Sequence, residues 1–155
     1  MSQQPGLVHD GMYRVVFADL IEDISAPTIA ELNAGIALEC QITPDGLGRE
    51  ASDSTIDTGR LCSIFTTMRM GRTEFEVSIT LVRHDTSIVG VTDEAYDTLV
   101  KRKTGFLVIR DNKPGDAAWS ATDEVEVYPV ECGTRSKATP AANEQMTFTI
   151  PMSVT

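Results

Sequence analysis

The side chains best suited to acid–base chemistry are too few and too scattered to form a catalytic site. His84 precedes Asp85, but consecutive residues of a strand point to opposite faces, so the acid is not placed to orient the imidazole as a base. The chain contains no Gly-Xaa-Ser-Xaa-Gly elbow, no phosphate loop ending in Gly-Lys-Ser/Thr and no His-Glu-Xaa-Xaa-His. We therefore expect no enzyme activity, no catalytic residue and no bound cofactor.

Two pairs of glutamates have the spacing that places both carboxylates on one face of a strand. They are Glu74 with Glu76, and Glu124 with Glu126. Paired carboxylates act as acid and nucleophile in glycosidases. Acids that alternate with apolar residues are more typical of a solvated strand face. We interpret all four as the exposed surface of a sheet.

Cysteine and histidine do not predict a metal site. Cys40, Cys62 and Cys132 are widely spaced, and only His9 and His84 are available to complete a ligand set. We expect three reduced cysteines packed inside the fold as small apolar residues, which agrees with assembly in a reducing cell.

The charge balance is acidic, with 13 basic and 23 acidic residues and a formal net charge of −10. Because Lys and Arg supply most of the non-specific affinity for phosphates, this balance argues against a protein that wraps nucleic acid. Two interpretations stay open: an acidic surface that keeps the protein dispersed, or one past which DNA slides without sticking. No apolar run approaches the roughly 20 residues of a membrane span. The N-terminus lacks a secretion-signal pattern, so we expect a soluble protein made in a cytoplasm.

Apolar and polar residues alternate over much of the chain, and this period predicts strands. Pro129 has no amide hydrogen to donate, so its strand should lie at a sheet edge or bulge there. Strands are expected over residues 13–18, 36–42, 74–81, 106–109, 124–132 and 146–154.

Two short helices interrupt the strands. The first lies within residues 25–35, where Thr28 and Glu31 have capping-box spacing and Gly35 offers a left-handed stop. The second covers residues 92–103, with acids in its first turn and bases in its last, as the helix dipole favours.

Two segments lack any periodicity. Residues 1–11 predict a flexible N-terminal arm. Residues 43–60 contain Pro44, Gly46 and Gly48 and predict a long loop. The length of 155 residues suits one domain. We predict a mainly β fold, a two-sheet antiparallel β-sandwich with one or two short flanking α-helices.

Several ordered blocks of sequence carry a family resemblance that covers most of residues 20–155. They are Asp-Ile-Ser-Ala-Pro-Thr through Gly at 23–35, Thr-Pro-Asp-Gly at 43–46, Thr-Gly-Arg-Leu-Cys-Ser at 58–63, Asp-Glu-Ala-Tyr through Thr-Gly-Phe at 93–106, and Val-Tyr-Pro-Val-Glu-Cys-Gly at 127–133. In this order and spacing, the chain resembles the major tail (tail tube) proteins of long-tailed siphophages that infect actinobacteria.

The resemblance implies a virion structural protein that self-assembles into stacked hexameric rings. The rings would form the hollow tail tube through which phage DNA passes into the host, with DNA in transit but not bound. The implied partners are other copies of the chain, the tape measure, the tail terminator and the distal tail protein. Assembly would take place in the host bacterial cytoplasm, without a membrane.

Within that picture, two sets of residues are candidates for assembly. An acidic wall would repel DNA over roughly 10 Å at physiological salt, so we expect Glu74, Glu76, Glu124 and Glu126 to line the channel. Long loops of the family reach adjacent subunits and rings. The candidates for an inter-ring loop are therefore Thr43, Pro44, Asp45, Gly46, Asp53, Asp57 and Arg60.

Two other classes of protein remain alternatives. A soluble β-sandwich module that binds carbohydrate or another ligand needs a concave aromatic patch, and Trp119, Tyr13 and Tyr128 are scattered in sequence. A different virion part, such as a tail terminator or a head-decoration protein, would also assemble, and only the shape of the assembly separates it from a tube subunit.

Overall fold

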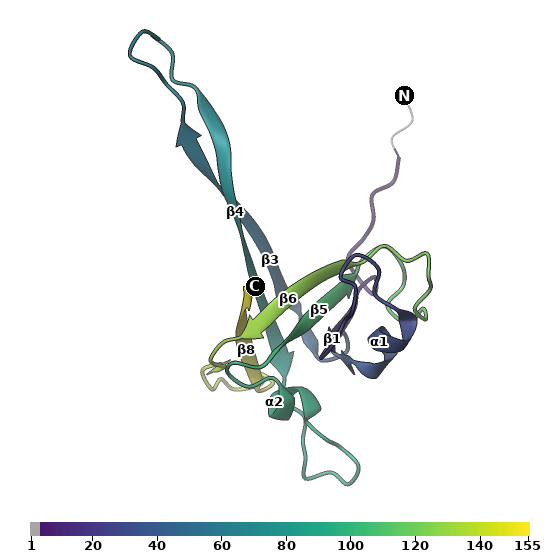
Figure 1. Ribbon diagram of the computed structural model, residues 1–155. Helices are drawn as coiled ribbons and strands as arrows, with labels where there is room; N and C mark the ends of the chain where they lie inside the picture. The colour runs from purple at the N-terminus through teal and green to yellow at the C-terminus, as the bar shows by residue number, and fades with distance from the viewer. Residues whose placement is uncertain (1–3) are drawn as a thin grey trace.

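The computed structural model describes residues 4–155 and is mainly β, as predicted, with every strand pair antiparallel (Figure 1). In chain order the elements are β1 Arg14–Ala18, α1 Ile29–Ala34, β2 Ile36–Ala37, β3 Ile42–Asp57, β4 Met68–Val82, α2 Glu94–Thr98, β5 Thr104–Arg110, β6 Glu126–Cys132, β7 Ser136–Lys137 and β8 Thr147–Val154.

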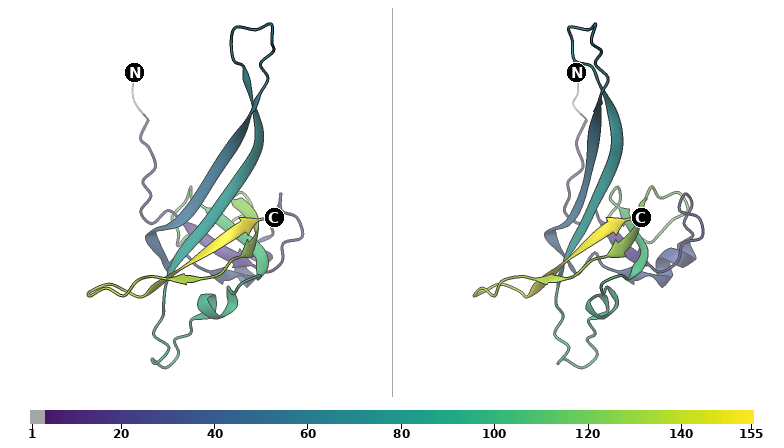
Figure 2. Two further views of the ribbon diagram at one scale, coloured as in Figure 1. Left: turned by 90° about the vertical axis from the view of Figure 1, so that its left-hand side faces the viewer. Right: turned by 60° about the vertical axis from the view of Figure 1, so that its left-hand side comes forward.

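The strands form one hydrogen-bonded path in the order β2-β1-β5-β6-β8-β4-β3, with β7 added beside β8. This path folds into two layers, because the buried side chains of β1 and β5 meet those of β4 and β8 in a single core. The pairing of β6 with β8 over Val130–Cys132 joins the layers. The sandwich therefore consists of two halves of a continuous sheet (Figure 2).

The period-2 pattern explains how β1 serves two cores. Val15 and Phe17 point into the main core between the layers. Val16 and Ala18 point the other way, into a second cluster with Leu32 of α1 and with Trp119. Since both faces of β1 are covered, its run of apolar residues is nearly continuous.

Helix α1 begins with the predicted capping box. The Thr28 hydroxyl accepts a hydrogen bond from the Glu31 amide at 3.3 Å, and the Glu31 carboxylate accepts one from the Thr28 amide at 2.8 Å. The predicted left-handed stop at Gly35 is wrong, because its φ is −75°. Glycine is needed there for space: a Cβ would lie 2.4 Å from a methyl of Val16 and 2.7 Å from the carbonyl oxygen of Phe17.

Two predicted elements are shorter in the structure than expected. The strand expected over residues 36–42 stops at Ala37, because Leu38 accepts hydrogen bonds from the amides of Gln41 and Ile42 in a turn. The helix expected over residues 92–103 is only α2, whose N-cap residue Asp93 makes no capping bond. Its buried carboxylate instead accepts hydrogen bonds from Gln41 and from Arg83, at 3.0 and 2.6 Å.

The largest correction concerns residues 43–60, where the structure has β3 as far as Asp57 in place of a loop. Of the predicted arm, residues 4–11 are exposed and have no helix or strand, and residues 1–3 lie outside the described part of the chain. Strand β6 is not at a sheet edge. It lies between β5 and β8, and its pairing with β8 begins one residue after Pro129.

Replacing Thr28 by Ala should lower the free energy of unfolding by about 1 kcal/mol, because the first turn of α1 loses its capping acceptor. Urea unfolding followed by circular dichroism measures the change. Asn33→Ala, on an exposed position of the same helix, is the control and should not destabilise the protein. Equal stability of Thr28→Ala and wild type would contradict the role of the capping box.

Candidate functional site

The most prominent feature of the molecule is the hairpin of β3 and β4, which rises far out of the body (Figure 1, Figure 2). The two strands pair from Ile42 opposite Leu81 to Asp57 opposite Met68. Strand β4 also pairs with β8, but only from Glu76 to Val82. Beyond Glu76 no second strand pairs with the hairpin in the described structure, although the Phe75 ring lies 6.1 Å from that of Tyr128. We call residues 51–75 the projecting hairpin.

The base and the projecting part of the hairpin differ completely in burial. Val77, Ile79 and Leu81 are at most 1 % exposed and belong to the main core. No residue of the projecting hairpin is buried. The core therefore anchors the hairpin only through its base.

Large apolar side chains are nevertheless concentrated on the projecting hairpin. Leu61 is fully exposed, and Ile64 and Phe65 are exposed by 93 % and 74 %. Exposed apolar side chains gathered in one place mark interaction surfaces on soluble proteins. The complete set of exposed large apolar residues here is Ile56, Leu61, Ile64, Phe65, Met68, Met70 and Phe75.

Local hydrogen bonds shape the end of the hairpin, residues 58–67, which we call the hairpin tip. The Thr58 amide and hydroxyl both donate to the carbonyl of Thr67, at 2.9 and 3.0 Å. The Ser63 hydroxyl accepts from the amide of Phe65 at 3.3 Å. Hydrogen bonds within the tip thus hold its backbone, while its large apolar side chains are exposed to solvent.

The predicted loop residues lie along this hairpin from base to tip. The segment Thr43–Gly46 lies at the base, where a register shift separates the pairs made by Ile42 and Leu47. Further along, the Asp53 carboxylate accepts a hydrogen bond from the Thr73 hydroxyl at 2.5 Å. Asp57 ends β3 and Arg60 follows in the tip. These residues are spread along the hairpin and form no compact cluster.

The outer face of β3, β4 and β8 is polar. Residues that pair across strands share a face, so the partners of Glu76 and Thr80 lie on the side opposite buried Val77. Thr80 and Thr149 join their hydroxyls at 2.9 Å. The face consists of Glu50, Ser52, Glu74, Glu76, Ser78, Thr80, Thr149, Pro151 and Ser153.

The structure separates the four predicted acids. Glu74 and Glu76 are exposed on this outer face, directly beside Ser52 and Glu50. Glu124 precedes β6, and Glu126 is not a free acid, because it pairs with Arg49. The sequence did not predict Glu50 as a member of this face, because the pattern of one strand does not show which strand pairs with it.

Arg49 of β3 connects the two layers through charge. Its guanidinium lies 2.7 Å from Glu126 of β6 and 3.4 Å from Asp111. Burial alone would lower the pKa of Arg49, but the hydrogen bond and charge of Glu126, followed by those of Asp111, leave it raised. Arg49 therefore stays charged and links the base of the hairpin to the opposite layer.

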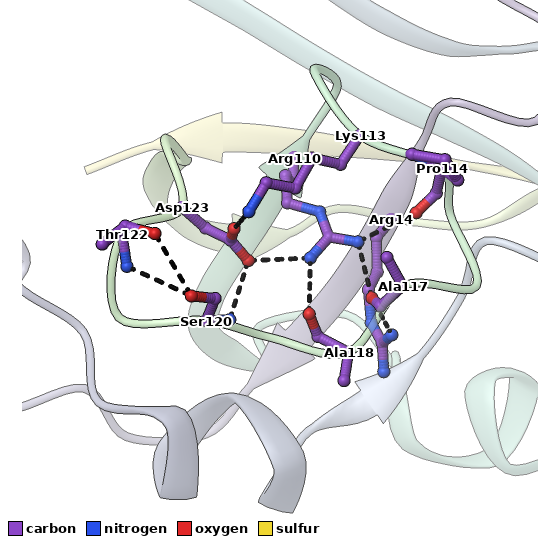
Figure 3. Close-up of polar contacts among 9 residues, drawn as sticks. All are labelled: Arg14, Arg110, Lys113, Pro114, Ala117, Ala118, Ser120, Thr122 and Asp123. Carbon is purple, nitrogen blue, oxygen red and sulfur yellow. Dashed lines mark hydrogen bonds and ion pairs between the residues drawn. The ribbon is translucent and has the colours of Figure 1, made fainter.

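A buried ion pair fixes the segment between β5 and β6 (Figure 3). Arg110 is fully buried and donates to Asp123 at 2.8 Å and to the carbonyls of Pro114, Ala117 and Ala118 at 2.7–3.1 Å. Lys113 also binds Asp123. The pKa of the Asp123 carboxyl is strongly lowered, first by Lys113 and next by the Ser120 amide.

The prediction that all three cysteines are packed inside the fold is wrong for two of them. Only Cys132 is buried, and burial raises its pKa to about 11, whereas Cys40 and Cys62 are exposed. The His84 ring lies 3.2 Å from the carbonyl of Thr92, while Asp85 accepts from Ser87. Within residues 4–155 no group of three or more His, Cys, Asp or Glu side chains is arranged to hold a metal ion. None of the helices described is long and apolar enough to cross a membrane.

Comparison with known proteins identifies the family. The sequence profile described as phage tail tube protein matches residues 1–155. The chain belongs to the phage tail tube protein family. It is thus a structural component of the phage tail, located in the virion. No curated protein matches the sequence.

One solved structure with a similar chain is the baseplate of the anti-feeding prophage. That chain is 13 % identical, the alignment covers 99 % of this chain and 94 % of the other, and the TM-score is 0.49.

The ion pair between Arg110 and Asp123 should make stability depend on pH. A carboxyl whose pKa is lower in the folded than in the unfolded state stabilises the fold at pH values above its unfolded pKa of about 4. This stabilisation is lost as the pH falls from there towards the folded pKa. We expect Asp123→Asn to lower the thermal midpoint by several degrees at pH 7, and by progressively less below pH 4. Asp116→Asn, an exposed acid of the same segment, is the control. A pH-independent difference between wild type and Asp123→Asn would contradict this account.

Proposed function

We propose that the chain closes into hexameric rings that stack into a hollow tail tube through which DNA passes. The tail would be that of a long-tailed siphophage infecting actinobacteria, assembled in the host cytoplasm with the tape measure, tail terminator and distal tail proteins. Membership of the tail tube family supports a tail component. The sequence blocks at residues 23–35, 93–106 and 127–133 support the narrower group.

The main support for assembly is that the projecting hairpin lacks a packing partner among residues 4–155. A two-stranded ribbon is marginal by itself in water, and three strands or a packed face are needed for stability. Within the described chain, residues 51–74 have neither, and at the lower end only the Phe75 ring lies near the body, 6.1 Å from the ring of Tyr128. A neighbouring copy that packs on the ribbon would supply both and would bury Leu61, Ile64 and Phe65.

The ends of the sheet support closure with neighbours. The order of strands leaves β2 at one end and β3 at the other. An uncovered edge presents unpaired backbone amides and carbonyls, which favours pairing with another chain. A closed ring of subunits removes such edges because each one meets the surface of the next copy.

We propose that the outer face of β3, β4 and β8 lines the lumen, with Glu74, Glu76 and Glu50 as its acids. Glu50 lies directly opposite Glu76, an arrangement in which like charges destabilise the pair. Retaining both acids at that cost fits a wall that repels DNA. Glu124 and Glu126 were also candidates, but Arg49 binds the Glu126 carboxylate and Glu124 precedes β6, so the proposal rests on Glu74, Glu76 and Glu50.

Replacing Leu61, Ile64 and Phe65 together by Ser should prevent assembly without unfolding the subunit. None of the three contacts the core, so the unfolding midpoint should stay at the wild-type value. The concentration needed for assembly should rise by at least about tenfold, because truncated interface anchors weaken association by that order. Sedimentation and negative-stain microscopy measure it.

The control for lost apolar surface is the pair Ile88→Ser and Val89→Ser, since these side chains are 57 % and 100 % exposed in another loop. We expect the control to assemble at the wild-type concentration. Rings or tubes of the triple variant at that same concentration would show that the hairpin is not an assembly element.

A density map of the assembled tube should place the Glu74 and Glu76 carboxylates on the channel wall. The physical reason is that these side chains share the polar face of β4 with Ser78 and Thr80. A map with this face on the outside of the tube would contradict the lumen assignment and would leave ring formation unaffected.

A further inference from the structure

A groove lies beside the base of the hairpin, between β1, the turn after β2 and the first residues of β3. Its volume is about 540 Å³, within the roughly 300–1,000 Å³ typical of clefts that hold a ligand. Its apolar lining comes from Tyr13, Val15, Ile42 and Leu47. Tyr13, Ile42 and Leu47 pack against the main core and are themselves only partly buried, so the groove is an open continuation of that core.

The groove also contains a carboxylate that lacks a partner. Glu39 is part of the lining. Its Oε2 is buried, and no residue of the described chain donates a hydrogen bond to it. A buried acceptor without a donor costs free energy, and more so when it is charged. Arg49 also lines the groove, but its guanidinium is engaged by Glu126 and Asp111 and not by Glu39. The groove is therefore suited to an occupant that has apolar side chains and one cation.

The hairpin tip has this combination of side chains. Arg60 is exposed and, unlike Arg49 or Arg83, forms no ion pair within the described residues. Next to it are Leu61, Ile64 and Phe65, which are among the most exposed apolar side chains of the molecule. Charge and apolar character thus match between the tip and the groove.

The tip does not reach the groove of its own chain. The groove is at the base of β3, while the tip is at the opposite end of the hairpin, and both figures show the hairpin directed away from β1 (Figure 1, Figure 2). Any pairing of these two surfaces therefore joins two copies.

We propose that the groove of one subunit receives the hairpin tip of a second copy, with Arg60 bound to Glu39 and the apolar tip residues on Tyr13, Ile42 and Leu47. The inference rests on the proposed assembly and names the surface that receives the hairpin. The contact is heterologous, since two different patches meet, so it propagates from copy to copy as a ring or a stack requires.

The natural cysteines provide a direct test. Cys62 belongs to the tip, Cys40 follows Glu39, both are exposed, and Cys132 is buried. Treating assembled protein with a short bis-maleimide should join Cys62 of one copy to Cys40 of the next and give a ladder of multimers on denaturing gels. Cys40→Ser and Cys62→Ser should each remove the ladder. Assemblies that give no ladder, or a Cys40→Ser variant that still gives dimers through Cys62 pairs, would overturn the inference.

A charge exchange tests the ion pair itself. Glu39→Arg and Arg60→Glu should each raise the concentration needed for assembly by roughly tenfold or more, because like charges then meet in the groove. The double variant restores opposite charges and should assemble close to the wild-type concentration. Lys101→Glu makes the same charge change as Arg60→Glu at an exposed turn and should have no effect.

These experiments distinguish a failure of the proposed tube assembly from a failure of the proposed docking in the groove. Wild-type protein that stays monomeric at high concentration would overturn both the proposed function and the groove. Tubes without cross-links, or single charge variants that assemble like wild type, would overturn the groove alone. Glu39→Gln, which keeps the side-chain shape, gives the same test if Glu39→Arg fails to fold.

Discussion

The pairing of β4 with β8 between Glu76 and Val82 is the interaction on which the rest of the molecule depends. Over these residues one strand completes the main core with Val77, Ile79 and Leu81 and holds the base of the hairpin. From Phe75 onward the same strand leaves the body, and β3 is its only hydrogen-bonded neighbour among the described strands. A rigid base and an uncovered extension therefore belong to a single strand. The core fixes the direction of the extension, but no residue of the extension belongs to the core.

Buried and half-buried charges hold the parts around this base in place. Arg49 links β3 to Glu126 and Asp111 of the opposite layer, and Arg110 holds the segment before β6 through Asp123. Apolar side chains of similar volume often give equal or greater stability than such pairs. The ion pairs also fix the relative orientation of the segments they join, because a guanidinium can donate to several acceptors at once only in one geometry. The Trp119 ring, whose centroid lies 5.0 Å from the Arg110 guanidinium carbon, is fixed by the same arrangement.

The sequence predicted those parts of the fold in which a buried face imposes its period. The alternation of Phe148, Ile150 and Met152 revealed β8, and the clean pattern up to Leu81 revealed the lower half of β4. The capping box of α1 was also correct, because Thr28 and Glu31 interact within one turn. In each case the deciding interactions are local or repeat along one strand.

The errors arose where structure depends on a distant partner. Residues 51–57 form a strand with both faces exposed, so their polar side chains carry no period-2 signal and resembled a loop. Glu126 has the sequence pattern of a solvated acid, yet Arg49, 77 residues away, binds its carboxylate. The helix expected up to Lys103 ends earlier for the same reason. The Lys103 carbonyl accepts a hydrogen bond from the amide of Cys132 in β6 and is therefore not available to a helix. The same holds for the candidate assembly surface. In the sequence, Leu61 and Phe65 resemble core residues, and only the structure shows that the hairpin holds them exposed, away from the core.

An exposed apolar hairpin is also a route to aggregation, and the details of the tip limit that risk. Its backbone is bonded between Thr58 and Thr67 and between the Ser63 amide and the Arg60 carbonyl, so the tip forms a closed turn and not an extended strand edge. Arg60 adds a charge that two tips brought face to face would have to bury without an acid. A groove with an unpaired carboxylate accepts that charge, and a second tip does not. Specificity then comes from the penalty on the wrong pairing as much as from the attraction of the right one, which favours directional assembly over symmetric tip-to-tip association.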